Sequence, residues 1–82
     1  VHVVDDDAST RRSLARLLGG ADYDVALYES AEVFLAVATP ALTGCVLLDL
    51  RLPGASGLEV QDRLAGLGCT IPIVFLTAHG DV

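Results

Sequence analysis

Four short apolar runs divide the chain, and each has the length of a strand. They occupy residues 1–4, 25–28, 45–49 and 71–77. A strand with one solvent-facing side would alternate apolar with polar residues, so uninterrupted runs are typical of strands that are buried on both faces of a parallel sheet. The pattern therefore predicts four buried strands.

Apolar residues at helical spacing predict a helix between each pair of strands. The first helix carries Leu14, Leu17 and Leu18 and ends at Gly19-Gly20. The second begins after Ser30, which suits an N-cap, and stops near Pro40. The third runs to Gly66 or Gly68 and is marked by Leu58, Val60, Leu64 and Leu67.

Strands that alternate with helices indicate an α/β fold in which right-handed crossovers build a parallel sheet with helices on both faces. With 82 residues, of which 52% are hydrophobic, the chain can form one small domain. It contains no apolar run of membrane-spanning length and no charged-then-apolar signal segment at its start.

The charge balance is acidic. The formal net charge is −6, which disfavours contact with nucleic acid or anionic membranes by this segment. The basic residues are all arginines, and the chain contains no Lys. Cys45 and Cys69 lack metal-binding spacing, so we interpret both as reduced, buried thiols of a cytoplasmic protein.

Polar side chains end three of the predicted strands. Asp5 and Asp6 follow the first, Asp49 ends the third and Thr77 ends the fourth. Sites in open parallel sheets form beyond the carboxyl ends of the strands. We therefore expect these residues, distant in sequence, to meet at one edge.

Converging carboxylates repel one another: two unit charges about 4 Å apart cost roughly 4 kcal/mol at an effective dielectric constant near 20. Either an acid becomes protonated or a cation lies among them. Carboxylate oxygens without Cys or His suit Mg²⁺, which completes its shell with water and phosphate oxygens. The cluster is thus a candidate site of phosphoryl transfer.

Two residues near these acids in the sequence are expected to have structural rather than chemical roles. Asp7 is interpreted as the residue that begins the first helix, because acids are favoured there by capping and by the helix dipole. His2 lies inside the first strand and is interpreted as structural.

Three segments, VVDDD, LLDLRLPGASG and FLTA, follow one another in the order and spacing of a response-regulator receiver domain. The second contains Asp49, Pro53 and Gly57 in an Asp-x-x-x-Pro-x-x-x-Gly pattern. The chain resembles this family over all its residues. Its two ends most resemble regulators of the nitrogen-fixation type, which carry a helix-turn-helix output domain of the LuxR kind.

The resemblance implies that Asp49 is the phosphoacceptor, which takes a phosphoryl group from the phosphohistidine of a sensor histidine kinase. Asp5, Asp6 and Asp49 would bind Mg²⁺ together with the backbone carbonyl of Arg51. The hydroxyl of Thr77 and the backbone N–H of Ala78 would contact the phosphoryl group.

The resemblance assigns two lesser roles. Pro53 and Gly57 would shape the loop behind Asp49. Arg51 and His79 stand two residues beyond Asp49 and Thr77, where the family tunes the rate of dephosphorylation.

The implied fold is an open, doubly wound, flavodoxin-like sheet with strand order 2-1-3-4. The family also has a fourth helix, a fifth helix, and a fifth strand that ends in a Lys paired with the phosphoryl group. This chain has no Lys and begins without Met inside a strand. We therefore expect residues 1–82 to be one receiver domain, without internal boundary, that is incomplete and comprises its N-terminal part, about two thirds.

The expected function is a cytoplasmic signalling switch that catalyses its own phosphotransfer and autodephosphorylation and has no separate substrate. It would control an output domain outside this chain and form a homodimer on phosphorylation. Two alternatives stay open. One is a degenerate receiver that is never phosphorylated and acts by docking or dimerisation, as the absent Lys would favour. The other is a haloacid-dehalogenase-type phosphohydrolase, which would need an Asp where Arg51 stands.

Overall fold

The computed structural model describes residues 1–50, 52, 54 and 56–76. Strands and helices alternate along this part of the chain, as predicted. The elements are β1 (His2–Val4), α1 (Ala8–Gly20), β2 (Ala26–Tyr28), α2 (Ala31–Val37), β3 (Val46–Asp49), α3 (Gly57–Gly66) and β4 (Ile73–Leu76).

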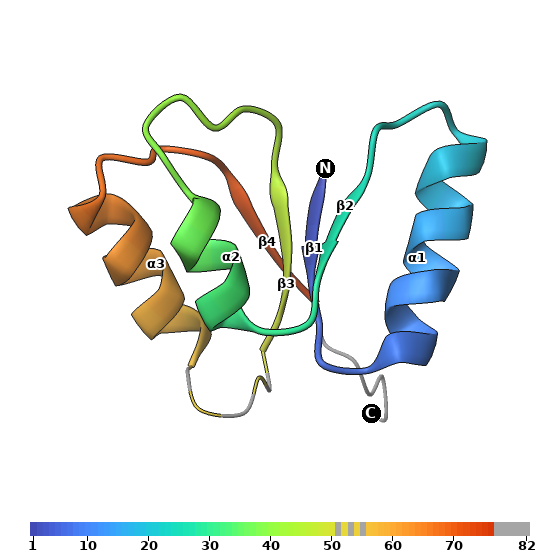
Figure 1. Ribbon diagram of the computed structural model, residues 1–82, viewed down its shortest axis with the longest axis horizontal. Coiled ribbons are helices and arrows are strands. Elements are labelled where there is room, and N and C mark those ends of the chain that lie inside the picture. The colour runs from blue at the N-terminus through green and yellow to red at the C-terminus, as the bar shows by residue number, and fades with distance from the viewer. Residues whose placement is uncertain (51, 53, 55, 77–82) are drawn as a thin grey trace.

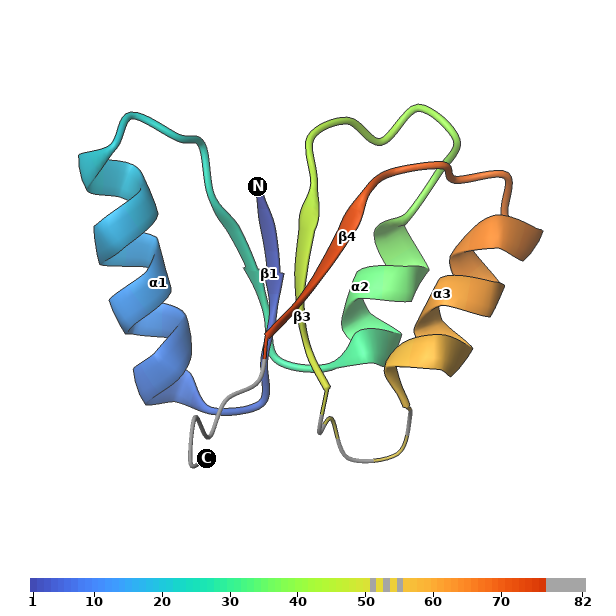
Figure 2. The same ribbon diagram turned by 180° about the vertical axis from the view of Figure 1, so that it is seen from behind.

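The strands form one parallel sheet in the order β2-β1-β3-β4. Helix α1 covers one face of the sheet, and α2 and α3 cover the other (Figures 1 and 2). The predicted strand order and the predicted helices on both faces are confirmed. The carboxyl ends of β1, β3 and β4 lie together at the lower edge in Figure 1.

The ends of the elements follow local chemistry. The hydroxyl of Ser30 accepts a hydrogen bond from the Val33 N–H at 3.2 Å and caps α2, as predicted. Helix α1 ends at Gly20, also as predicted, but Asp22 rather than a glycine takes the left-handed conformation beyond it (φ 67°). Asp tolerates this region better than most residues. The strands β2 and β4 are each shorter than the apolar runs that predicted them.

The main core lies between the sheet and the helices α2 and α3. It includes Val4 and Leu48 from the sheet, Phe34 from α2 and Leu64 from α3. The rings of Tyr28 and Phe34 meet edge-on with their centroids 5.0 Å apart. This packing fixes the face of the sheet opposite α1.

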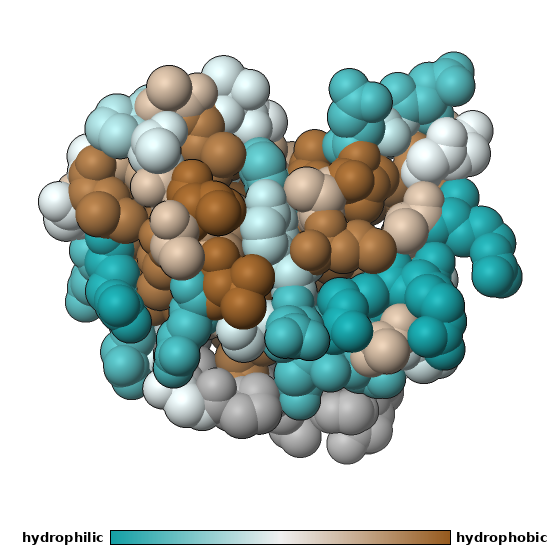
Figure 3. Space-filling view, in the orientation of Figure 1, coloured by the Kyte–Doolittle hydropathy of each residue, from teal (hydrophilic) through white to brown (hydrophobic). Residues whose placement is uncertain are grey.

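The α1 face is much less covered. No residue of α1 is fully buried, and Leu17 is 71% exposed. Leu14 and Leu18 are half-buried, and Leu27 of β2 is exposed. Figure 3 shows apolar side chains gathered beside α1 as well as over α2 and α3. A single helix shields only a strip of a four-stranded face.

The two cysteines are both free thiols, as predicted. Cys69 is buried, but Cys45 is only half-buried, so the prediction of burial is wrong for Cys45. Among the described residues, no helix has the length and apolar character needed to cross a membrane.

Two leucines of α3 test where the core lies. Leu64 is 1% exposed and Leu58 is 71% exposed, although both belong to the pattern that predicted the helix. Leu64→Ala should lower the free energy of unfolding by about 2–5 kcal/mol, because it leaves a cavity under the sheet. Leu58→Ala should change it by less than about 0.5 kcal/mol. Urea denaturation of both variants gives the two values, and equal losses would contradict this placement of the core.

Candidate functional site

Parallel pairing of the central strands brings two carboxylates together. Val4 of β1 lies opposite Leu48 of β3, so the residues that follow them, Asp5 and Asp49, continue side by side. Asp6 is the next residue at the same edge. The register alone therefore places carboxyl groups 44 positions apart in the sequence at one point of the structure.

The three carboxylates form a compact cluster. One oxygen each from Asp5, Asp6 and Asp49 lies within 4.8 Å of the other two. Asp5 is 2% exposed and Asp49 is 5% exposed, whereas Asp6 is open to solvent. The cluster therefore has two buried members and one member that reaches water.

Hydrogen bonds hold Asp5 from three directions. Its N–H donates to the carbonyl of Tyr28 at 3.1 Å, and its Oδ1 accepts from the N–H of Asp7 at 2.9 Å. Its own carbonyl accepts from Nη1 of Arg11 at 2.7 Å. The backbone at the end of β1 is thus tied to β2, to the following turn and to α1.

The environment opposes ionisation of Asp5. Burial raises the pKa of its carboxyl above the usual value, and the Asp7 N–H that donates to it acts in the opposite direction. The negative charges of Asp49, Asp6 and Asp7 add to the rise. A cation among these groups would favour the charged form by removing the repulsion.

Asp7 has the separate role that the sequence predicted. Its Oδ1 accepts from the Ser9 N–H at 3.0 Å, and its Oδ2 accepts from the Thr10 hydroxyl at 2.9 Å. The Thr10 hydroxyl lowers the pKa of Asp7, and the Ser9 N–H lowers it further. Asp7 is the N-cap of α1.

His2 also has the predicted structural environment. Its Nε2 lies 3.0 Å from the carbonyl oxygen of Thr43, and its Nδ1 lies 3.3 Å from the hydroxyl of Tyr28. The ring lies beside Phe34 with a centroid separation of 5.8 Å. These contacts are at the amino end of β1, away from the acidic cluster.

The donor set of the cluster fits a hard dication. It consists of carboxylate oxygens, and burial limits the water that could otherwise stabilise Asp5 and Asp49. Because Asp6 is exposed, a bound ion would keep contact with water, as Mg²⁺ requires. Such an ion would be held by Asp5, Asp6 and Asp49.

Proteins with similar sequences and the same fold identify the family of this chain. A family model described as response regulator receiver domain matches residues 1–82. This chain belongs to the response regulator receiver domain family. It is a receiver domain of the two-component type, as the motifs predicted.

Two curated relatives show the extent of the similarity. Nodulation protein W of Bradyrhizobium diazoefficiens is 48% identical over 82 residues, which are 100% of this chain and 36% of that protein. The transcriptional regulatory protein FixJ of Rhizobium meliloti is 43% identical over 82 residues, 100% of this chain and 40% of that protein. The receiver domain described here therefore spans 36–40% of the length of these relatives.

Two solved structures share the fold. The response regulator StyR matches with a TM-score of 0.88 and 47% identity, over 99% of this chain and 41% of that one. The structure of FixJ-N matches with a TM-score of 0.87 and 42% identity, over 99% of this chain and 65% of that one.

Several predicted site residues lie outside the described residues. They are Arg51, Pro53, Thr77, Ala78 and His79. Their roles stay predictions.

Gly57 lies where the predicted loop after Asp49 ends. It is the first residue of α3, directly after the N-cap Ser56. A Cβ on Gly57 would lie 2.5 Å from Cε1 of Phe75, which is closer than carbon atoms approach. The receiver needs glycine here so that the start of α3 can pack against β4.

Arg11 is a site neighbour that the sequence reasoning missed. Its spacing of three and seven residues from Leu14 and Leu18 puts it on the same helical face as these leucines, which indicated no contact with the acidic residues. The structure brings its guanidinium to the Asp5 carbonyl instead. Its position six residues after Asp5, in the first turn of a helix that follows a strand end, is the signal that could have identified it.

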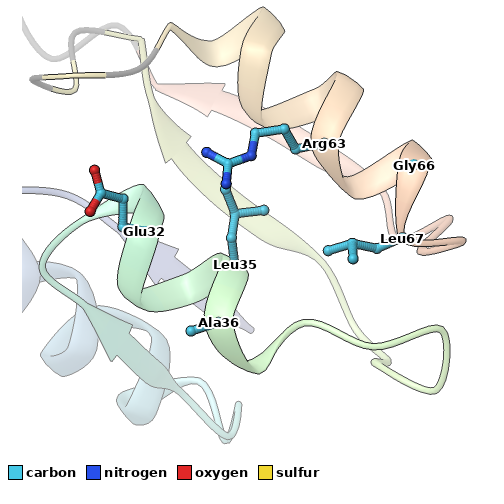
Figure 4. Close-up of a pocket in the computed structure, with 6 residues that line it drawn as sticks. All are labelled: Glu32, Leu35, Ala36, Arg63, Gly66 and Leu67. Carbon is cyan, nitrogen blue, oxygen red and sulfur yellow. The ribbon is translucent and has the colours of Figure 1, made fainter.

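A groove of about 560 Å³ lies between α2 and α3, apart from the acidic cluster. Its lining comprises Glu32, Leu35, Ala36, Arg63, Gly66 and Leu67. Figure 4 shows the Arg63 side chain extending from α3 towards α2. The lining contains no member of the carboxylate cluster, so the receiver's acidic chemistry lies elsewhere.

Removing one buried charge should stabilise the metal-free domain. Asp5→Asn keeps an oxygen that can accept from the Asp7 N–H and removes the repulsion with Asp49. At pH 7 in EDTA it should raise the free energy of unfolding by about 1 kcal/mol, and Tm by about 4–8 °C. Thermal unfolding followed by circular dichroism measures the shift.

The pH dependence of this gain has a definite sign. A raised pKa means that folded Asp5 binds its proton more tightly than unfolded Asp5, so the unaltered domain loses stability as the pH rises through the folded value. The gain from Asp5→Asn should therefore vanish below about pH 3.8, where both states are protonated. The exposed Asp62→Asn variant is the charge-matched control. A loss of stability in Asp5→Asn at pH 7 in EDTA would contradict the electrostatic account.

Gly57→Ala should destabilise the receiver by about 1–3 kcal/mol, because the methyl group overpacks the contact with Phe75. Gly66→Ala is the control in the same helix, since a Cβ there meets no atom within 4 Å. It should be neutral or stabilising by up to about 1 kcal/mol. Denaturant unfolding separates the two, and equal stability of both variants would show that the Phe75 contact does not require glycine.

Proposed function

We propose that this receiver domain is a phosphoacceptor switch in which Asp49 takes a phosphoryl group from the phosphohistidine of a sensor histidine kinase. The observation that carries the proposal is the cluster of Asp5, Asp6 and Asp49, whose oxygens approach within 4.8 Å. Burying like charges together costs folding free energy, so such a cluster indicates a function that requires it. Phosphoryl transfer with a bound dication is a function of this kind.

Asp49 is the proposed nucleophile. A carboxylate oxygen of Asp49 attacks the phosphorus, the phosphorus–nitrogen bond of the donor breaks, and the histidine nitrogen keeps the bonding electron pair. Bound Mg²⁺ would offset the negative charge that the carboxylates and the phosphoryl oxygens bring together. Asp5 and Asp6 would hold the ion beside Asp49, and their position at the same edge of the sheet supports this role.

Residues beyond the described ones complete the proposed site. The backbone carbonyl of Arg51 would be a further metal ligand, and Thr77 and the Ala78 N–H would contact the phosphoryl oxygens. Thr77 follows Leu76, which pairs with Asp49 in the ladder between β3 and β4. This pairing supports a position for Thr77 near the nucleophile. Pro53 would shape the loop after Asp49, and Arg51 and His79 would tune dephosphorylation.

The output is proposed to be transcriptional. Relatives are named transcriptional regulatory proteins, and this chain matches 36–40% of their length. We infer a protein in which phosphorylation of this domain controls a helix-turn-helix output domain, with homodimerisation on phosphorylation, in the cytoplasm. The domain would catalyse only its own phosphorylation and dephosphorylation, and it would have no separate substrate. The net charge of −6 supports an output in which DNA is contacted by another domain.

The alternatives differ in what they require of single residues. A haloacid-dehalogenase-type phosphohydrolase needs an acid two residues after its nucleophile, and Arg51 stands there. A receiver that acts by docking alone needs no nucleophile. The absence of Lys from the chain is the feature that favours docking, and labelling separates it from the switch.

Labelling of the full-length protein tests the proposal. Incubation with Mg²⁺ and phosphoramidate or acetyl phosphate should yield a phosphoryl adduct that is stable in acid and labile in base. Asp49→Asn should abolish it, because an amide oxygen is a poor nucleophile, and EDTA should suppress it. Intact-mass spectrometry measures the adduct.

Asp62→Asn is the control for this labelling, because Asp62 is an exposed residue of α3 and the change in charge is the same. It should be labelled like the unaltered protein. Undiminished labelling of Asp49→Asn would overturn the assignment of Asp49. No adduct on the unaltered protein, with either the small donors or a kinase, would favour the docking alternative.

A further inference from the structure

Arg11 lies in the first turn of α1 and reaches back to the end of β1. Its Nη1 donates to the backbone carbonyl of Asp5 at 2.7 Å, in a partly buried position. Its neighbour Arg12 carries the same charge on the same turn but is exposed. The two arginines therefore have the same charge, but only Arg11 contacts the backbone of the carboxylate cluster.

The Arg11 contact fixes a specific peptide plane. The Asp5 carbonyl belongs to the peptide that joins Asp5 to Asp6, so holding this oxygen sets the orientation of the Asp6 Cα as well. The other end of Asp5 is held by its N–H, which donates to Tyr28. Together these bonds leave the turn little freedom before Asp7 begins the helix.

Asp6 depends on this backbone more than Asp5 does. The Asp5 carboxylate is buried and accepts from the Asp7 N–H. The Asp6 side chain is exposed, and within the described part of the chain none of the side-chain hydrogen bonds holds it. The peptide that Arg11 holds therefore fixes where the Asp6 Cα lies, and so limits the positions that its carboxylate can take.

The guanidinium of Arg11 donates to a backbone carbonyl rather than to a carboxylate of the cluster. A cation at the cluster would then compete with no direct ion pair from Arg11, whose hydrogen bond goes to a backbone oxygen. Deleting Arg11 thus has two opposing effects on a dication. Loss of a nearby positive charge would strengthen binding, and loss of the ordered peptide would weaken it.

We propose that Arg11 is a positioning residue, which fixes the Asp5–Asp6 peptide so that the Asp6 carboxylate stays within reach of Asp5 and Asp49 before a cation arrives. This inference rests on the proposed function, since it assumes that the cluster binds Mg²⁺. Arg11 acts through the backbone and touches neither the phosphoryl group nor the nucleophile.

The sign of one substitution tests the inference. In the full-length protein, Arg11→Met keeps an unbranched stem of good helix propensity and removes the donor. Mg²⁺ affinity, measured by calorimetric titration with magnesium chloride at fixed ionic strength, should fall about tenfold. The control Arg12→Met makes the same change of charge one residue away and should bind Mg²⁺ as tightly as the unaltered protein or slightly more tightly.

Two further measurements separate positioning from a structural defect. The amide resonance of Asp6 in the metal-free protein should shift or broaden in Arg11→Met and stay in place in Arg12→Met. Arg11→Lys, which restores a charged donor of similar reach, should recover part of the lost affinity. We expect both results even if the variants have equal melting temperatures, because the effect is on the position of Asp6 and not on global stability.

The outcomes distinguish this inference from the proposed function. Mg²⁺ affinity in Arg11→Met that equals or exceeds that of the unaltered protein would overturn the positioning role and leave the phosphoacceptor proposal intact. An unaltered protein that binds no Mg²⁺ and is not labelled by phosphoramidate would overturn the proposed function, and the positioning role with it.

Discussion

The structure depends on the parallel register between β1 and β3. Once Val4 lies opposite Leu48, the residues that follow both strands are carboxylates, and they must share one edge. Burial and mutual repulsion then raise the pKa of Asp5, so the fold carries an electrostatic cost at the place where its chemistry lies. Main-chain donors around Asp5 and a cation among the carboxylates are the two means of offsetting that cost.

The rest of the molecule is arranged to hold that edge. A well-packed core between the sheet and the helices α2 and α3 contains Val4 and Leu48, the residues directly before Asp5 and Asp49. Opposite this core, α1 is packed more lightly and contributes the cap Asp7 and the donor Arg11 to the turn after β1. The face covered by α2 and α3 thus fixes the strands, and the face covered by α1 fixes the turn that contains Asp5 and Asp6.

Much of this architecture follows from the sequence. Apolar runs that end in acids predict both the parallel sheet and the meeting of Asp5 with Asp49, because all parallel strands end at one edge. The cap at Asp7 is equally predictable, since capping depends on the adjacent residues alone.

Other features could not be predicted because they depend on how elements approach in space. The glycine at position 57 is required by the distant ring of Phe75 rather than by a turn. Arg11 shares a helical face with Leu14 and Leu18, but only the approach of α1 to β1 brings its guanidinium to the Asp5 carbonyl.

The central claim is that the carboxylate cluster is a built cation site. A titration of the ¹⁵N-labelled protein with magnesium chloride, at ionic strength held constant with sodium chloride, tests it most directly. The account predicts saturable shifts of the amide resonances of Asp5, Asp6 and Asp49 together, with little change at the amino ends of the strands. Shifts that do not saturate, or that are reproduced by sodium chloride alone, would contradict it.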